Sequence, residues 1–404
     1  MRKKKTYWFL LTITILMYIS FGLLTSVIGV IIERFRIQYD VSLQIAALLP
    51  FAFYLSYGLL SIPFGMAMDR ISPRFVLLLG MVIMTVGSFL FYFSSNYLVV
   101  IFMIFLTGAG VTAIQTAGNP FIRELDIPKR YTANLTIIVG IGALGYAVSP
   151  ILLPLTEAGG LTWNTVYLFF GIINAVLLFL LIIAKFPAIT ISAEEKIQTS
   201  VILILIKKPI IITYALGIFF YVGAEVGTSS YIISFMEKIH GIGVNESLWK
   251  KGSFLASVFP SVSAMAVAAF WLFQAVGRLI IGPIMKYVKP RKIFMIHSAL
   301  TCITLLITIY SPAKFALIGF ALTGYFTCAS FTSIFSAAIQ SFDKYHGTIS
   351  GILCTAIVGG AVLGFLVGFA GDILNLQVAM YINILAFLYI FSLAVWGKGK
   401  LDFA

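Results

Sequence analysis

The sequence predicts an all-α membrane protein with twelve transmembrane helices arranged as two six-helix pseudo-symmetric halves. Three observations predict this: an apolar composition, apolar runs of membrane-spanning length along the whole chain, and an internal repeat. The 404 residues are 61% hydrophobic and only 10% charged, whereas soluble domains are about half apolar and about a quarter charged. This composition excludes a soluble enzyme, a disulfide scaffold and a disordered tail.

Each predicted span is an apolar run of about 20 residues or more, the length needed to cross a hydrocarbon core. In order, the spans are expected near residues 7–32, 42–68, 75–94, 97–118, 132–155, 163–186, 209–235, 256–285, 293–311, 314–340, 347–372 and 376–396. The runs do not alternate as transmembrane β-strands would. Only short turns separate them, which leaves no room for a separate soluble catalytic domain.

The first span follows a basic start, Arg2 to Lys5, and so resembles a signal peptide. Its apolar stretch is too long and lacks a small-residue cleavage site, and it is therefore predicted to be retained. The three cysteines, Cys302, Cys328 and Cys354, lie inside apolar runs. They are expected to be core residues with no disulfide, redox or metal role.

The net charge of +13 follows from the sidedness of the connecting loops. An even number of spans places both termini on one side, and most of the 27 basic residues lie on that side. The exceptions are Arg278 inside a span and six residues on the opposite side: Arg34, Arg36, Lys238, Lys250, Lys251 and Lys314. By the positive-inside rule both termini are cytoplasmic. The basic balance then requires no nucleic-acid partner.

The longest cytoplasmic interruption, residues 187–208, divides the chain into an N-terminal half, 1–186, and a C-terminal half, 209–404. Within it, Val201 to Ile206 is apolar and ends at Lys207 and Lys208. That piece is either a short interfacial helix or a plain linker.

The internal repeat supports this division. One shift of the sequence superposes Phe53 on Phe270, Gly65 on Gly282 and Arg74 on Arg291. The ends of the second and eighth spans therefore match, together with the loops that follow. Parallel repeats of six spans place a solute site between the halves, near the bilayer midplane.

The loop after the second span reads Gly65-Met-Ala-Met-Asp69-Arg70-Ile-Ser-Pro-Arg74. It resembles the G-x-x-x-D-R-x-G-R signature of the major facilitator superfamily, with Ser72 in place of a glycine. Gly65 lets helices approach closely. Asp69 can accept hydrogen bonds at the N-terminus of another helix, where the dipole favours negative charge.

The expected partner of Asp69 is the start of the eleventh span, around Gly347 and Thr348, and this contact would latch a cytoplasmic gate. Alternatively, Asp69 only balances Arg70 and Arg74. The full set of predicted gating residues is Asp69, Arg70, Arg74, Arg278 and Arg291.

Further stretches resemble one branch of that superfamily, the fucose/glucose/galactose proton symporters. They are Gln115-Thr-Ala-Gly-Asn119-Pro120 in the fourth span, Tyr221-Val-Gly-Ala-Glu225 in the seventh, Trp271 with Gly277-Arg278 in the eighth, Phe331-Thr-Ser-Ile-Phe335 in the tenth and Ser350 to Gly360 in the eleventh. The resemblance implies the major facilitator fold and a sugar-like solute. It extends over spans 2, 4, 7, 8, 10 and 11.

The departures from this branch concern proton coupling. Members that couple sugar to protons use an aspartate in the first span, where this chain reads Gly22-Leu-Leu-Thr25-Ser26 without an acid. Gln115 stands where many have a glutamate, and the polar residues of their fifth span are missing around Thr136. The resemblance therefore supports architecture and solute class better than it supports proton symport.

Two ionisable residues inside the predicted spans need an explanation, Glu225 and Arg278. A charge near the bilayer centre costs roughly 2.5 to 3.5 kcal/mol, so both are expected to face inward. At about 1.5 Å per residue, their depths differ by about 12 Å, which argues against a direct ion pair. Glu225 is predicted to bind solute hydroxyls or to carry a coupled proton; alternatively, it only holds helices of the C-terminal half together. Arg278 is predicted to act in gating or structure.

Sugars are bound through amide and hydroxyl hydrogen bonds and an aromatic platform. The predicted solute-binding residues are Gln44, Gln115, Asn119, Tyr221, Glu225, Trp271 and Gln274. Some of these are expected to be hydrogen-bonding glue between helices. Trp271 and Gln274 lie three residues apart, on one helix face.

The sequence therefore predicts a secondary active transporter that moves a small solute, a hexose or related sugar, by alternating access as a proton symporter. A facilitative uniporter of the same solutes and an efflux antiporter for amphipathic drugs or lipids remain alternatives. No nucleotide-binding loop, metal-ligand cluster or nucleophile with its base is found in the sequence, so no enzyme activity, cofactor or metal is expected. The expected protein is a monomer in the lipid bilayer of the cell membrane.

Overall fold

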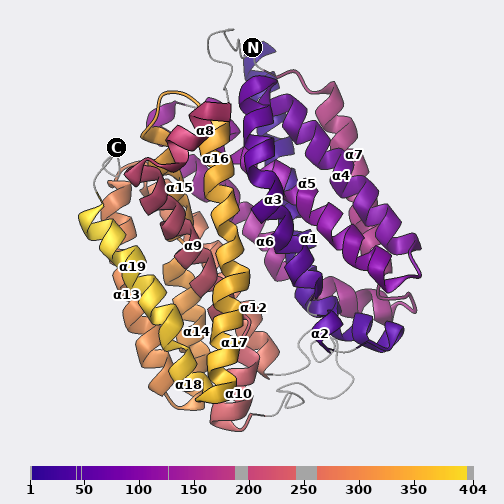
Figure 1. The fold of residues 1–404 in the computed structure, drawn as a ribbon, viewed down its shortest axis with the longest axis vertical. Helices are drawn as coiled ribbons and strands as arrows, with labels where there is room; N and C mark the ends of the chain where they lie inside the picture. Colours follow the sequence, from indigo (N-terminus) through magenta and orange to yellow (C-terminus); the bar gives the residue numbers. More distant parts are fainter. Residues whose placement is uncertain are drawn as a thin grey trace. The chain divides into compact units, whose positions relative to one another are not determined.

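The computed structural model describes residues 2–41, 43–46, 48–125, 127–186, 199–242 and 262–397. Its α-helices are α1 (Arg2–Tyr39), α2 (Leu43–Ala46), α3 (Leu48–Arg70), α4 (Pro73–Phe93), α5 (Tyr97–Glu124), α6 (Tyr131–Ala158), α7 (Thr165–Ile183), α8 (Thr199–Ile206), α9 (Pro209–Ser229), α10 (Ile232–His240), α12 (Val262–Ile284), α13 (Pro290–Tyr310), α14 (Ala313–Thr327), α15 (Ser330–Gln340), α16 (His346–Thr355), α17 (Gly359–Ile373), α18 (Leu376–Ala379) and α19 (Tyr381–Trp396) (Figure 1). No strand occurs in these ranges, and the predicted all-α class is confirmed.

Twelve helical segments in the described ranges are long and apolar enough to cross a membrane. The predicted number of spans is therefore confirmed, and most of the span ends agree within a few residues. The predicted start of the eighth span, 256–261, and most of the predicted linker, 187–198, fall outside the described residues. The apolar stretch before Lys207 does form a short helix, α8.

Two spans have a break near their middle, where one helix ends and another begins. The tenth, Ala313–Gln340, changes from α14 to α15 at Cys328 and Ala329. The eleventh, His346–Ile373, changes from α16 to α17 through a 3-10 turn at Ala356–Val358. Such irregular turns inside a span free backbone carbonyls and often mark hinges.

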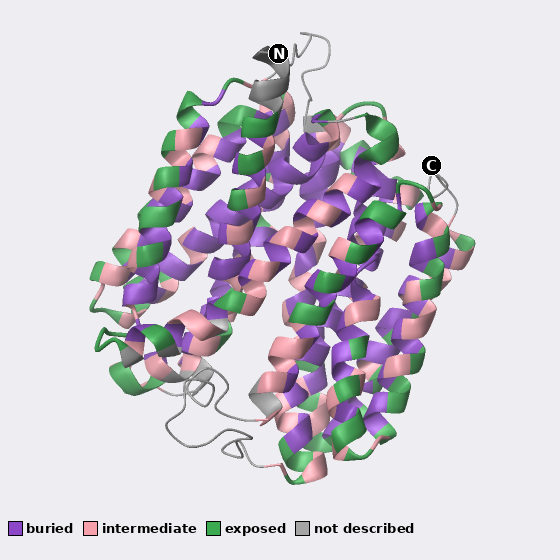
Figure 2. Cartoon of the chain, turned by 180° about the vertical axis from the view of Figure 1, so that it is seen from behind, coloured by how far each residue is buried: buried purple, intermediate pink, exposed green. Residues whose placement is uncertain are grey.

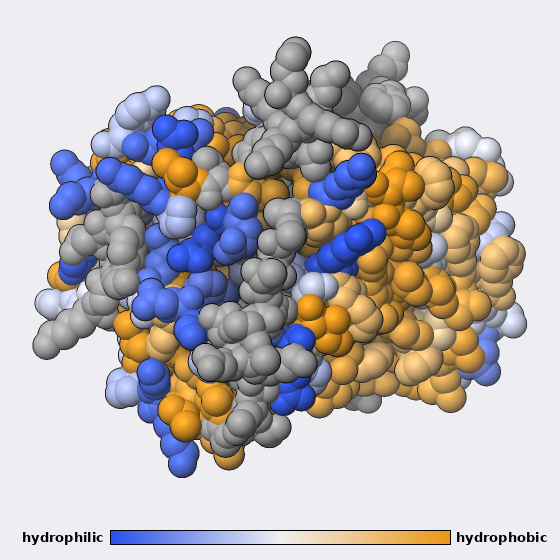
Figure 3. All heavy atoms as spheres, turned by 90° about the horizontal axis from the view of Figure 1, so that it is seen from above, coloured by the Kyte–Doolittle hydropathy of each residue, from blue (hydrophilic) through white to orange (hydrophobic). Residues whose placement is uncertain are grey.

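Large apolar side chains cover the outside of the helices. Phe365 is 70% exposed and Phe93 is 72% exposed, which a soluble protein rarely tolerates over a wide surface. Figure 2 shows that the long helices carry both buried and exposed faces, and Figure 3 shows hydrophobic residues over a large continuous area with hydrophilic residues gathered in separate patches. The exposed faces therefore suit contact with lipid.

The chain forms two compact units. The first contains Met1–Tyr131, Leu144–Ile212 and Ala338–Ala356; the second contains Thr132–Ala143, Thr213–Ala337 and Ile357–Ala404. Helix α6 thus gives Thr132–Ala143 to the second unit and its other residues to the first, and α16 belongs to the first unit while α17 belongs to the second. Each of these two spans connects the units, and the predicted division at residues 187–208 stays a prediction.

Two arginines at repeat-related positions make equivalent contacts. In the first unit, Arg74 Nη2 donates to the carbonyl oxygen of Ile182 at 2.9 Å, near the end of α7. In the second, Arg291 donates to the carbonyls of Ala394 and Val395, at 3.2 and 2.8 Å, near the end of α19. Both satisfy carbonyls at a helix C-terminus, where the dipole favours a cation. At these two positions the repeat in the sequence is thus matched by equivalent contacts in the structure.

Replacing Arg291 with alanine is expected to destabilise the protein by about 1–2 kcal/mol, because the last carbonyls of α19 lose a partly buried cation. The measurement is the apparent Tm of the detergent-purified protein at a fixed scan rate. Lys292→Ala removes the neighbouring exposed cation and is expected to leave the Tm unchanged. Equal Tm values for the two variants would contradict this role of Arg291.

Candidate functional site

Four polar residues form a buried cluster in the second unit. Tyr221 and Glu225 lie one turn apart on α9, and Gln274 and Arg278 lie one turn apart on α12, so each pair shares a helix face. Their exposed fractions are 1%, 9%, 0% and 6%. Because buried polar groups need partners, their contacts define the cluster.

The carboxylate of Glu225 is the centre of the cluster. Its Oε1 accepts hydrogen bonds from the Tyr221 hydroxyl and from Gln274 Nε2. Arg278 Nη2 lies 3.7 Å from the same oxygen and donates to the Tyr221 hydroxyl at 3.3 Å. A buried ion pair survives only when hydrogen bonds satisfy its atoms, and here both partners are bonded to Tyr221.

The break between α14 and α15 completes the cluster. Arg278 Nε donates to the carbonyl of Cys328 at 3.4 Å, and Gln274 Nε2 lies 3.2 Å from Thr327 Oγ1. The irregular backbone of the tenth span thus supplies an acceptor to the guanidinium. Gln274 Oε1 is buried and has no hydrogen-bond partner among the described residues.

The expectation that Glu225 and Arg278 are too far apart to pair is wrong. Counting residues placed Pro209 and Lys286 at equal depth and ignored the direction of the side chains. Helical side chains lean toward the N-terminus of their helix. Since α9 and α12 are consecutive spans that run in opposite directions, the two side chains lean toward each other.

The aromatic residue predicted to line this site, Trp271, lies on α12, half-buried, with its ring centroid 5.3 Å from that of Phe270. It is one turn from Gln274, on the face that the spacing predicts. For Gln44, the side chain lies outside the described residues, although its backbone belongs to α2.

A second polar cluster lies in the first unit, around the two amides of α5. Tyr57 donates to Gln115 Oε1 at 2.6 Å, and Tyr18 donates to Asn119 Oδ1 at 2.5 Å. Tyr131 donates to the backbone carbonyl of Asn119 at 3.0 Å. Asn119 Nδ2 is buried and has no hydrogen-bond partner among the described residues.

Sequence reasoning missed Tyr18 and Tyr57, which form these bonds. Neither belongs to a recognisable motif. The available signal was general: a tyrosine hydroxyl inside an apolar span needs a buried acceptor, and the amides of α5 are such acceptors.

The predicted partner of Asp69 is confirmed. The backbone amides of Gly347 and Thr348 donate to Asp69 at 2.9 and 2.7 Å, and the Thr348 hydroxyl donates at 2.7 Å. The residue before α16, Tyr345, has a left-handed backbone (φ 64°) and makes no capping bond with its side chain. Asp69 on α3 therefore caps α16 in its place.

The close approach of the two helices depends on Gly65. A side-chain carbon at Gly65 would collide with the backbone carbonyl of Gly347. Of the other predicted gating residues, Arg70 is exposed at the end of α3. Arg74 and Arg291 donate to backbone carbonyls near the C-terminal ends of α7 and α19. We call the contact of Asp69 with Gly347 and Thr348 the latch.

Comparison with known proteins agrees with this architecture. The model of the Major Facilitator Superfamily matches residues 10–269. The chain is 28% identical to a glucose/galactose transporter of Brucella abortus biovar 1 (strain 9-941), over 96% of this chain and 93% of that protein. It is 21% identical to an L-fucose-proton symporter of Escherichia coli (strain K12), over 90% and 87% of the two chains.

Among solved structures, the crystal structure of the E. coli fucose:proton symporter matches with a TM-score of 0.80 at 20% identity, over 97% of this chain and 99% of that one. At this identity the match shows the fold. Together with the family model, it confirms the resemblance that the motifs predict. The chain belongs to the Major Facilitator Superfamily and is a multi-pass membrane transporter, not an enzyme.

Proposed function

We propose that this protein is a secondary active transporter that carries a hexose or related sugar across the cell membrane by alternating access, as a proton symporter. The observation that carries the proposal is the buried carboxylate of Glu225, paired with Arg278 inside a membrane span. A buried ion pair is costly and contributes little to stability on its own. A role in transport accounts for its presence.

The sugar part of the proposal rests on the open hydrogen-bonding groups of the two clusters and on the names of the similar proteins. Gln274 Oε1 can accept from a solute hydroxyl, and Asn119 Nδ2 can donate to one. Sugar hydroxyls do both. Trp271 supplies an aromatic face, and Gln44, Gln115, Tyr221 and Glu225 complete the proposed binding set.

The proton part rests on Glu225. One oxygen of the Glu225 carboxylate contacts Tyr221, Gln274 and Arg278. When a proton binds to the carboxylate, some of these contacts are lost. Protonation therefore changes how the helices are held together. Asp69, Arg70, Arg74, Arg278 and Arg291 remain the proposed gating residues. We further propose a monomer with halves 1–186 and 209–404, linked by 187–208, and with both termini in the cytoplasm.

A facilitative uniporter of the same sugars is the second candidate. It is favoured by Thr25 and Ser26 in the first span, where proton-coupled sugar transporters carry an acid, and by Gln115 in the fourth. An efflux antiporter for amphipathic drugs or lipids has less support, because the N-terminal half carries the polar cluster around Gln115 and Asn119.

The deciding experiment uses the purified protein in liposomes with labelled hexoses, with and without an inward proton gradient. A proton symporter accumulates sugar above the external concentration only with the gradient. A uniporter equilibrates the sugar in both conditions, and this result would replace the symport proposal. No uptake of any sugar would overturn the solute class.

A further inference from the structure

The short helix α8 has two unlike faces. Ile202 and Leu205 are 7% and 3% exposed, and α8 contacts α16 inside the first unit (Figure 1). Leu203 and Ile204 turn away from the protein and are 62% and 59% exposed. One face thus holds α8 against the protein, and the other presents apolar side chains that the described residues do not cover.

Two exposed lysines, Lys207 and Lys208, follow directly after this apolar face. Neither forms an ion pair among the described residues. The Lys208 ammonium lies 5.1 Å from the centroid of the Phe342 ring, a contact that holds the side chain but leaves its charge in place. The end of α8 therefore carries positive charge that no described carboxylate pairs with.

The start of α9 fixes the depth of these residues. Helix α9 begins at Pro209 and is long and apolar enough to cross the membrane. Ile212 is 45% exposed, and at about 1.5 Å per residue it lies about 6 Å along the helix from Lys208. Phe342, which Lys208 contacts, lies just before the span that begins at His346. Both lysines and α8 are therefore expected at the level of the headgroups.

The chemistry of α8 identifies the surface that it contacts. A short helix with apolar side chains beside exposed lysines binds at the boundary of acyl chains and headgroups. Lysine ammonium groups extend toward the headgroups while their carbon chains stay beside apolar groups. A zwitterionic headgroup has no net charge to offer them, whereas an anionic phospholipid does. Each lysine near an anionic surface strengthens the attraction about fivefold.

We propose that α8 binds anionic phospholipids at the surface of the bilayer. Leu203, Ile204 and Ile206 insert among the acyl chains. Lys207 and Lys208 bind the phosphate groups of neighbouring headgroups. With the termini in the cytoplasm, as proposed above, this is the cytoplasmic leaflet. The inference goes beyond sugar transport, because it assigns a binding partner to the linker helix and does not depend on the solute.

The test measures how fast N-ethylmaleimide labels a cysteine on the exposed face of α8. Ile204→Cys is made in a chain in which Cys302, Cys328 and Cys354 are alanine. The liposomes contain phosphatidylcholine alone or phosphatidylcholine mixed with phosphatidylglycerol. Only the thiolate reacts, and it does not form among acyl chains, so insertion slows labelling. Each rate is divided by that of Asp343→Cys, in the exposed loop before α16, which corrects for the charge of the lipid surface.

The relative labelling rate is expected to be lower by about fivefold or more in the mixed liposomes than in phosphatidylcholine alone, since one lysine already supplies that factor. Replacing both lysines, Lys207→Gln with Lys208→Gln, is expected to abolish this difference between the lipids. Lys289→Gln with Lys292→Gln is the matched control. It removes the same charge from two exposed positions beside the start of α13 and is expected to keep the difference.

Equal relative rates in the two kinds of liposome would overturn the preference for anionic lipid. If Ile204→Cys labels as fast as Asp343→Cys in the mixed liposomes, α8 lies in water as a plain linker, and insertion is overturned. A full lipid difference in the variant without Lys207 and Lys208 would overturn the role of the lysines. The comparison of lipids needs no lysine variant, so it decides the proposal even if that variant fails to fold.

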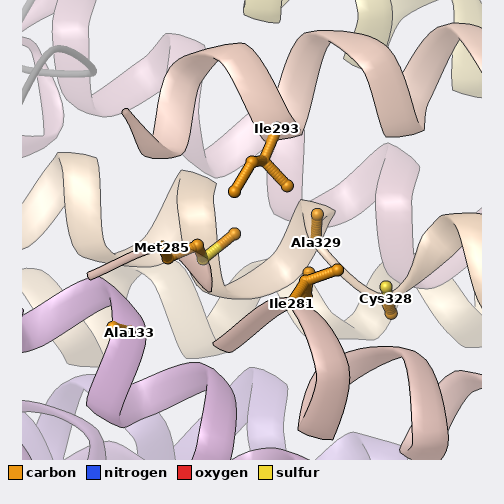
Figure 4. Close-up of a cluster of buried hydrophobic side chains, with 6 residues drawn as sticks. All are labelled: Ala133, Ile281, Met285, Ile293, Cys328 and Ala329. Carbon is orange, nitrogen blue, oxygen red and sulfur yellow. The ribbon is translucent and has the colours of Figure 1, made fainter. Parts of the chain in front are cut away.

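The native Cys328 reports whether each chain is folded. It is fully buried in an apolar cluster of the second unit, and Figure 4 shows its neighbours Ala133, Ile281, Met285, Ile293 and Ala329. A chain that keeps only this cysteine is expected to label slowly in both lipids and with either pair of lysine replacements. The assay contains no sugar. Failure of sugar uptake would therefore leave the lipid result intact, and failure of the lipid response would leave uptake intact.

Discussion

An Asp69→Ala variant is expected to lose most of its transport activity, by about tenfold or more. The substitution removes the acceptor of three hydrogen bonds from Gly347 and Thr348. A hydrogen bond to a charged group contributes about 1.5–3 kcal/mol. Asp69 is half-buried, so the total is discounted for solvent, yet about 1.4 kcal/mol already changes an equilibrium tenfold.

The physical reason lies in the start of α16. Tyr345 does not cap the first backbone amides of α16. Without Asp69, these amides at the positive end of the helix dipole have no acceptor where α16 packs against α3. At Gly65 and Gly347 the backbones lie so close that a side-chain carbon at either position would collide with the carbonyl oxygen of the other glycine. The latched state is therefore the one that loses stability, and a transporter that cannot reach one of its states stops cycling.

The measurement is initial uptake in liposomes at equal protein content. Asp69→Asn keeps one carbonyl acceptor and is expected to retain intermediate activity. Asp372→Ala is the matched control, because Asp372 is 81% exposed and its pair with Lys238, at 3.7 Å, is a surface salt bridge. Wild-type uptake by Asp69→Ala would show that the latch is not needed for transport.

The latch also illustrates what a sequence can predict. The contact of Asp69 with Gly347 is predictable because two signals indicate it: a sequence motif, and the general rule that a carboxylate is favoured at a helix N-terminus. The spans were predictable for the same reason: each is a continuous stretch whose own composition decides its environment.

Contacts that depend on side-chain direction or on irregular backbone were not predictable. Glu225 and Arg278 pair because side chains on two antiparallel helices lean toward each other. A depth estimate that only counts residues along each helix does not include this lean. The carbonyl of Cys328 is available only because the tenth span breaks there. Tyr18 and Tyr57 meet their amides across helices, and no local pattern encodes that meeting.

A Glu225→Gln variant is expected to lose gradient-driven accumulation of sugar while it keeps exchange of sugar across the membrane. Glutamine keeps the size of the side chain and an oxygen that accepts from Tyr221, but it cannot bind a proton. One pH unit corresponds to about 1.36 kcal/mol, so a one-proton symporter accumulates its solute about tenfold per unit of gradient. The variant is expected to reach only the external concentration.

Two measurements separate the roles of Glu225. Uptake against a pH gradient reports proton coupling, and counterflow of labelled sugar into loaded liposomes reports solute binding and helix movement without net proton transfer. Glu157→Gln is the matched control, because Glu157 pairs with Arg34 at 3.0 Å in a partly exposed site near the end of α6. It is expected to leave both measurements unchanged.

The outcome decides between the two leading functions. If the wild type accumulates sugar and Glu225→Gln only exchanges it, the carboxylate carries the proton. If Glu225→Gln loses both activities while it keeps the wild-type Tm, the carboxylate serves the solute or the helix contacts instead. If the variant equals the wild type in both, Glu225 has no part in the mechanism. The ion pair with Arg278 would then be a structural link of the C-terminal half, and coupling would have to come from a residue other than this acid, which within the described part of the chain is buried beside an arginine.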